Sequence, residues 1–479
     1  MMKNSIVKIV IILLIIASML GVIGFTYSYF SLEIEGNSKE VTVTTGNLKL
    51  QYIDNTELNL IDAVPGDYIT KEILVKNIGT KSVSYNLKLN DLINTIDDFE
   101  LSITLTCESY NSNNELKGKC PDIYRTIGYS ETKTSKTLKK NIEIDVGITH
   151  KYTVVIKFVN KDYSQDSNLN KKFSSVLSLE EYEVPKTVNC TYDGEMVQGT
   201  KFVKGQYTYS YKQEGDYAGI NAINWKNIDE DGWGVQLSSK VSTDPVSGEI
   251  CSYINGKPIV SMNDAYYLSQ ATSIDITGID TRNVTNMHGM FYDSKATVIT
   301  GLETIDTSKV TNMRSMFINS KASKLNLETF DTSKVTNMGN MFAGVNLTEP
   351  LNLSNFDTSN VTDMSSMFYL SAMKKMDISN FNTKNVTSMN GMFQSTTIDK
   401  LDLRNFDISN VTASNRMLGD TKINILNLSN LIISDDTVLV DIFANSTIKE
   451  IIVNNEETLN ILKSTSNIPS NMKFTLKTS

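Results

Sequence analysis

Residues 330–342 read FDTSKVTNMGNMF, and this stretch is one of six copies of the same unit. The central valine of the unit recurs at spacings of 26, 25, 26, 25 and 25 residues. A fixed period of this length is typical of a solenoid, in which each copy forms one coil and buries its apolar side chains against its neighbours. The six valines are Val284, Val310, Val335, Val361, Val386 and Val411.

Each copy combines two apolar patterns. Leu325 and Leu327 alternate with a polar residue, which predicts a short strand, and Asp331 begins a turn. From Val335 to Phe342 the apolar residues fall at i, i+3, i+6 and i+7, which predicts one face of a short helix. We therefore expect a right-handed β/α solenoid of ~25-residue repeats, with the Val, Met and Phe side chains in its core.

The repeated motif FDTSxVTxMxxMF resembles the BspA-like, leucine-rich-like repeats of bacterial surface proteins, over residues 256–450. This resemblance implies an exported protein, because members of that family act outside the cell and several are implicated in adhesion. The family shares no single ligand, so the resemblance indicates where the protein acts and leaves its partner open.

The N-terminus independently indicates export. Two lysines precede an apolar run over residues 9–25, which is the layout of a secretory signal. Small side chains predict cleavage between Ser28 and Tyr29. The alternative is a retained membrane anchor, since 17 residues is the lower limit for a membrane-spanning helix. Either outcome predicts a secreted or cell-surface protein.

Residues 25–185 carry a second resemblance. TGNLKL at 45–50, PGD at 65–67 and KNIG at 76–79 resemble the TasA/camelysin-like secreted family. Short alternating strands separated by Gly, Asn and Asp clusters predict an antiparallel β-sandwich here. We divide the chain into a signal peptide or anchor (1–28), this sandwich (29–185), a small β-rich linker or capping module (186–255) and the solenoid (256–479).

The four cysteines allow three disulfide pairings. Proximity in sequence favours Cys107 with Cys120 and Cys190 with Cys251, because each bridge then stays within one predicted domain. Structural disulfides are common in exported proteins, and buried free thiols are the alternative. The chain has no CxxC pair, so a zinc site is disfavoured.

The sequence offers little that could catalyse a reaction. Its two histidines, His150 and His288, fall in different predicted domains, and HExxH, GxSxG and P-loop motifs are absent. We therefore expect a protein that is not an enzyme and has no cofactor. The net charge of −9 disfavours a nucleic-acid partner.

One partial calcium motif occurs in the capping module. Asn227, Asp229 and Asp231 resemble the start of an EF-hand loop, but Ser238 stands where a bidentate glutamate is needed. The pattern favours a plain acidic turn over a calcium site.

The repeats place polar residues in two columns. The first begins the turn of each copy, and we expect its oxygens to accept backbone N–H groups, because an asparagine replaces the aspartate in one copy. Its members are Asp280, Asp306, Asp331, Asp357, Asn382 and Asp407.

The second column lies between the core residues of each short strand and is expected to point away from the core. It is either a solubilising ladder or part of a ligand-binding face. We call it the Asn/Asp column, and its members are Asn326, Asn352, Asp377, Asp402 and Asn427.

These observations predict an exported, non-catalytic surface protein of a Gram-positive bacterium. It would adhere to or recognise an extracellular protein or glycan, including host matrix, through the solenoid. The alternative is a biofilm matrix fibre, in which the TasA-like domain self-associates by donating its strand near residues 29–50 to the next subunit.

Overall fold

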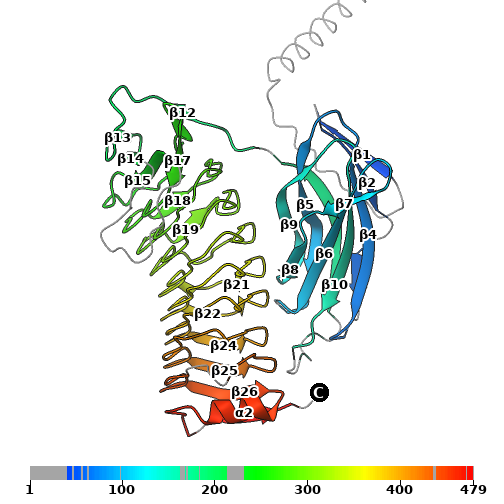
Figure 1. Cartoon of the computed structure of the whole chain (residues 1–479), viewed down its shortest axis with the longest axis vertical. Coiled ribbons are helices and arrows are strands. Elements are labelled where there is room, and N and C mark those ends of the chain that lie inside the picture. The colour runs from blue at the N-terminus through cyan, green and yellow to red at the C-terminus, as the bar shows by residue number, and fades with distance from the viewer. Residues whose placement is uncertain are drawn as a thin grey trace, which may run out of the picture.

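The computed structural model describes residues 40–477, apart from 46–47, 55–57, 62–63, 98, 162–164, 166–167, 169–170, 183, 213–230, 435–438 and 471. It consists of two lobes that lie side by side, a sandwich and a solenoid (Figure 1). The predicted signal segment and its cleavage point at Ser28 and Tyr29 lie outside the described residues. Within the described part, no helix is long and apolar enough to span a membrane.

The N-terminal lobe contains two antiparallel sheets that share one apolar core. Seven strands form the first sheet, in the order β1-β2-β4-β10-β6-β7 with β8 also paired to β6, and the second has the order β3-β11-β5-β9. Along β10, Tyr152, Val154 and Ile156 are buried and pack with Leu87 and Leu89 of the other sheet. The alternation of apolar residues thus produces the antiparallel sheets that the sequence predicts.

The bounds of the first sheet are β1 (Glu40–Thr45), β2 (Leu48–Asp54), β4 (Tyr68–Asn77), β6 (Leu101–Tyr110), β7 (Leu116–Lys119), β8 (Ile123–Ile127) and β10 (Thr149–Phe158). Those of the second are β3 (Leu58–Ile61), β5 (Val83–Asn94), β9 (Ser130–Ile144) and β11 (Lys172–Glu181).

A six-stranded module precedes the coils. Its buried side chains include Tyr209 and Trp233, and they belong to the same apolar cluster as the solenoid core. The Leu237 N–H donates to the Ala265 carbonyl of the first coil at 2.8 Å. The module is therefore one body with the solenoid. Its strands are β12 (Asn189–Cys190), β13 (Lys201–Lys204), β14 (Tyr207–Lys212), β15 (Gly232–Leu237), β16 (Tyr253–Ile254) and β17 (Lys257–Ser261).

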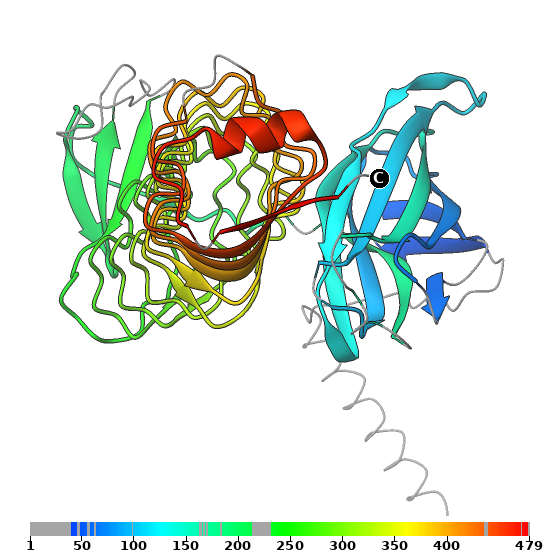
Figure 2. The ribbon, with the colours of Figure 1, turned by 90° about the horizontal axis from the view of Figure 1, so that it is seen from below.

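The repeats form a parallel β-solenoid. Short strands of successive copies pair in register, and Figure 2, which looks along the stack, shows the coils superposed with α2 (Glu456–Lys463) across the last one. The strands are β18 (Ser273–Asp275), β19 (Val298–Thr300), β20 (Asn346–Leu347), β21 (Leu351–Asn352), β22 (Ala372–Met373), β23 (Met376–Asp377), β24 (Thr397–Asp402), β25 (Lys422–Asn427), β26 (Thr447–Val453) and β27 (Lys473–Leu476).

The predicted helix in each copy is wrong, so the solenoid is β and not β/α. Among the described residues, α2 is the only α-helix. Between Val335 and Phe342 the chain makes tight turns instead, and Asn340 has a φ of 58°, a left-handed conformation that interrupts a right-handed helix. Backbone N–H groups donate to the next coil, as from Phe317 to Met341 O at 2.9 Å. The helix-like spacing arose because these turns direct the same side chains inward.

The core prediction for the repeats is confirmed. The Val, Met and Phe side chains of the full copies, such as Val335, Met338 and Met341, are almost completely buried. One aromatic ring per copy stacks on the next, with centroids 5.2–5.7 Å apart and nearly parallel planes. This spacing is close to the ~4.8 Å between strands. The stacked rings are Tyr266, Phe291, Phe317, Phe342, Phe368 and Phe393.

Candidate functional site

From Asn352 onward, the Asn/Asp column faces the sandwich. Asn352, Asp377 and Asn427 are at most 8% exposed, Asp402 is partly buried, and Asn326 is half-buried. The column points away from the solenoid core, as expected, but the sandwich covers it instead of solvent. The physical reason is that the edges of the two sandwich sheets lie directly on it.

Local geometry holds the column residues in place. The Asn352 Oδ1 atom accepts the N–H of Ser354 at 3.0 Å, and the Asp377 Oδ1 atom accepts the N–H of Ser379 at 2.9 Å. Such Asx turns end each short strand and leave the second side-chain atom directed at the sandwich. The same turns join Asp402 to Arg404 and Asn427 to Ser429.

Thr126 of β8 is the centre of the contact. Its N–H donates to Ser354 Oγ at 3.0 Å, and its hydroxyl donates to Asp377 Oδ2. Its carbonyl accepts from Asn352 Nδ2 at 3.3 Å and from Lys136 Nζ at 2.7 Å. The solenoid thus satisfies polar groups of an edge strand that would otherwise be exposed to other chains.

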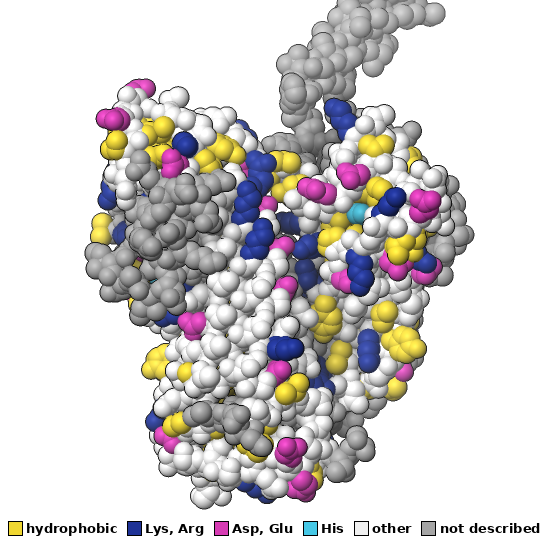
Figure 3. Space-filling model, in the orientation of Figure 1, with side chains coloured by type: hydrophobic (Ala, Val, Ile, Leu, Met, Phe, Trp, Pro, Cys, Tyr) yellow, Lys and Arg dark blue, Asp and Glu magenta, His cyan; other side chains and the backbone are white. Residues whose placement is uncertain are grey.

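Three lysines of the sandwich pair with carboxylates of the solenoid, and Lys136 and Lys161 are less than 10% exposed. Figure 3 shows basic and acidic side chains gathered where the lobes meet. We call this contact the seam. Its ion pairs are Lys136 with Glu328 at 2.9 Å, Lys139 with Asp331 at 3.3 Å and Lys161 with Asp402 at 3.6 Å.

The seam keeps the carboxylates of Glu328 and Asp331 ionised. Burial alone would raise the pKa of Glu328, but the charges of Lys136 and Arg125 outweigh it, so the pKa lies below its usual value. The pKa of Asp331 is also lowered, because Lys139 and the Ser333 donors outweigh burial. Burial lowers the pKa of Arg125 to about 10, and it remains charged at neutral pH.

A cavity of about 260 Å³ lies within the seam. Asp97, Phe99 and Lys161 line it from the sandwich, and Met376 and Asp402 line it from the solenoid. The two lobes therefore meet through polar contacts around a space, and not through close apolar packing.

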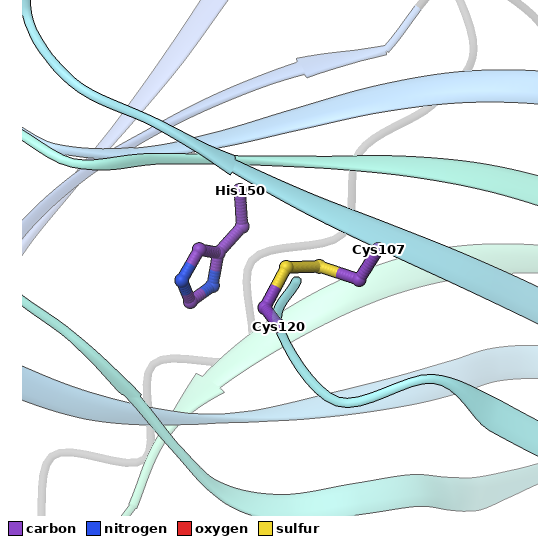
Figure 4. A group of neighbouring side chains, drawn as sticks. All are labelled: Cys107, Cys120 and His150. Atoms are coloured by element: carbon purple, nitrogen blue, oxygen red, sulfur yellow. A yellow bond between two sulfur atoms is a disulfide. The ribbon is translucent and has the colours of Figure 1, made fainter. Parts of the chain in front are cut away.

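The structure joins Cys107 to Cys120 and Cys190 to Cys251. The first bridge lies beside His150, with the ligand atoms within 4.8 Å of one another (Figure 4). Bonded sulfurs offer no thiolate to a metal, and the Nδ1 atom of His150 hydrogen-bonds the Tyr85 hydroxyl at 2.9 Å. Burial lowers the pKa of His150 to about 4, so it is a neutral part of the sandwich core.

The other site candidates are held by structural contacts. His288 lies in the second coil, with its Nδ1 atom 3.1 Å from Asn263 Oδ1 of the first. Of the partial calcium loop, Asn227 and Asp229 lie outside the described residues. Asp231 accepts from the Tyr211 hydroxyl at 3.2 Å and lies 3.5 Å from Lys257 Nζ.

The first polar column behaves as predicted. The Asp306 Oδ1 atom accepts the N–H of Ser308 at 2.9 Å, and Asn382 Oδ1 accepts that of Lys384 at 3.2 Å. The backbone role of this column is confirmed, since the amide replaces the carboxylate in the same bond.

Comparison with known proteins bears on the repeats alone. Residues 260–349 and 340–454, together less than half of the chain, match a family described as Mycoplasma protein of unknown function, DUF285. No curated protein matches the chain. The family match and the β-solenoid of ~25-residue coils fit a repeat surface protein.

Proposed function

We propose that this chain is an exported, non-catalytic surface protein that recognises an extracellular protein or glycan through its solenoid. The regular coils carry the proposal, because they hold polar side chains in fixed columns over a long surface. The predicted signal segment and the match of the repeats support the location.

The flank of the coils that carries the VT motif is the best candidate for the recognition face. Along it, the Asn385 side chain donates to Ser359 O at 2.7 Å, and the Thr387 hydroxyl donates to Thr362 O at 3.2 Å. These bonds to the preceding coil fix the side chains before any ligand arrives, which reduces the entropy lost on binding. We call this surface the open flank, and its exposed members are Asn360, Thr362, Asn385, Thr387, Asn410 and Thr412.

The test is binding of residues 29–479 to an array of matrix proteins and glycans. Deleting the repeats is unsuitable, since the module shares the solenoid core. Instead, Thr362→Lys with Thr387→Lys would place two long charged side chains on the open flank. We expect this variant to lose binding, while Lys117→Glu on the sandwich retains it. Equal binding by both variants would contradict the open flank, and no binding by the native chain would contradict the function.

The fibre alternative has one supporting observation. β1 lies at the end of the seven-stranded sheet, where a strand can be exchanged between copies. Residues 29–39 of the proposed donor strand lie outside the described residues. Removal of residues 29–50 should abolish sedimentable assemblies if the sandwich polymerises in this way, and persistence of the assemblies would exclude strand donation.

A further inference from the structure

The two lobes have separate apolar cores. One cluster runs from Cys190 to Leu462 through the module and all coils, and the other joins the two sandwich sheets from Leu58 to Leu179. Among the described residues the two clusters have no member in common. Each lobe therefore has a core of its own, although Ile378 and Leu401 of the solenoid core line the cavity in the seam.

The connection between the lobes also permits separation. β11 ends at Glu181 and β12 begins at Asn189, and the chain between them crosses from one lobe to the other (Figure 1). Val184 in this linker is 58% exposed. Polar interfaces between domains joined by such linkers commonly allow relative motion.

We infer that the Asn/Asp column, with Glu328 and Asp331 beside it, is a docking site for a basic β-strand edge, and that the chain's own sandwich covers it. An external partner with a cationic segment would bind there by displacing the sandwich. This inference rests on the proposed function and adds to it the chemistry of one partner class and the means by which access is controlled.

The charges explain why the occupant must be basic. Glu328 and Asp331 lie on one coil, Asp377 lies two coils further along, and Asp402 lies on the coil after that. Like charges on neighbouring coils, such as Asp377 and Asp402, are ~5 Å apart and repel. Lys136, Lys139 and Lys161 of the sandwich supply opposite charges within 4 Å. A neutral or acidic partner would desolvate Glu328 and Asp331 without supplying the lysine charges, which is unfavourable. Asp402 would keep Arg404 of its own coil as a partner at 3.0 Å.

The dependence on charge makes closure sensitive to salt and to competition. Mobile ions weaken attraction between partly exposed pairs such as Lys139 with Asp331, whose side chains are each about 30% exposed. Buried pairs such as Lys136 with Glu328 respond less, but they lose their partners once the lobes separate. We therefore expect the contact to open in a concerted manner as ionic strength rises.

The experiment reverses the basic side of the seam in the full chain. The test variant is Lys136→Glu with Lys139→Glu and Lys161→Glu. The control, Lys117→Glu with Lys119→Glu and Lys151→Glu, makes the same change in net charge at exposed or half-exposed positions of β7 and β10. Small-angle scattering measures the radius of gyration, and titration with an octalysine peptide measures access to the acidic surface.

We expect the test variant to have a larger radius of gyration than the control and to bind octalysine at least tenfold more tightly. Raising the salt concentration should enlarge the unmodified chain in the same way, a result that does not depend on whether the variant folds. An unchanged radius of gyration in both experiments would overturn the proposal that the sandwich is a removable cover of the Asn/Asp column. Opening without tighter octalysine binding would overturn the basic-partner assignment. Neither result depends on the extracellular ligand, so failure here is distinct from failure of the proposed function.

Discussion

The solenoid meets its two neighbours in different ways. The module of β12 to β17 shares the apolar core of the coils and hydrogen-bonds to the first coil through backbone groups. The sandwich meets the coils through lysines, carboxylates, Thr126 and a cavity. Apolar burial makes the first contact permanent, because separation would expose core side chains to water. The second depends on charge and can open.

Among substitutions that test this difference between the two contacts, loss of one ring from the aromatic stack should change stability the most. Phe342→Ala should lower the free energy of unfolding of the solenoid and module together by about 3–5 kcal/mol, since Phe342 is fully buried between two other rings. Chemical denaturation checks this result. Ile432→Ala, at a side chain that is 56% exposed, is the matched control and should change little. Equal loss of stability in the sandwich would contradict the separation of the cores.

The sandwich has its own covalent constraint. Replacing Cys107 and Cys120 by serine should lower the stability of the sandwich by about 3 kcal/mol, because the bridge closes a short loop in the unfolded chain. Hydrogen exchange would locate the change. We expect faster exchange in β6 and β10 and an unchanged exchange rate in the coils. Simultaneous loss of protection in both lobes would show that they unfold as one unit.

Acid should destabilise the sandwich through His150. Its pKa is about 4 in the folded state, because it is buried, and near 6.5 when unfolded. The unfolded chain therefore takes up the proton first as pH falls, and stability decreases below pH 6.5. Between pH 6.5 and pH 5 the expected loss is about 2 kcal/mol. His150→Gln should flatten the profile for the sandwich over this range. An unchanged slope would contradict the buried neutral imidazole.

The smallest effect is expected from removing one exposed charge of the coils. It tests whether charge matters in the coils as it does at the seam. The carboxylate of Asp357 is exposed and accepts the N–H of Ser359 at 2.9 Å. Asp357→Asn should leave stability nearly unchanged, since an amide oxygen accepts the same bond, whereas Asp357→Ala should cost about 1 kcal/mol. Urea denaturation of both variants measures the difference. Equal losses would mean that the charge, and not the turn, is important there.

Much of the solenoid could be predicted from its sequence, because each copy repeats the same local constraints. The 25- or 26-residue period set the coil, and the recurring Val, Met and Phe positions identified the core. The helix prediction failed because the spacing of Met338, Met341 and Phe342 records which side chains face inward and not which backbone groups are bonded. The positive φ of Asn340 interrupts a helix there, and the apolar spacing carries no signal of it.

The seam could not be predicted, because no repeated pattern encodes it. Thr126 and Lys136 lie in ordinary alternating strands, and Glu328 occupies a position that is Ser354, Ser379 or Arg404 in later copies. Contacts between residues about 190 to 270 positions apart leave no local signal. The Asn/Asp column was found from its spacing, but its burial depends on a second domain.

Hydrogen exchange at two amides tests the central claim directly. The Thr126 N–H donates across the seam to Ser354 Oγ at 3.0 Å, and the Leu237 N–H donates across the module contact to Ala265 O at 2.8 Å. If the seam opens and the module contact does not, raising the salt concentration will accelerate exchange at Thr126 and leave Leu237 protected. Unchanged exchange at Thr126, or equal acceleration at both amides, would contradict the account.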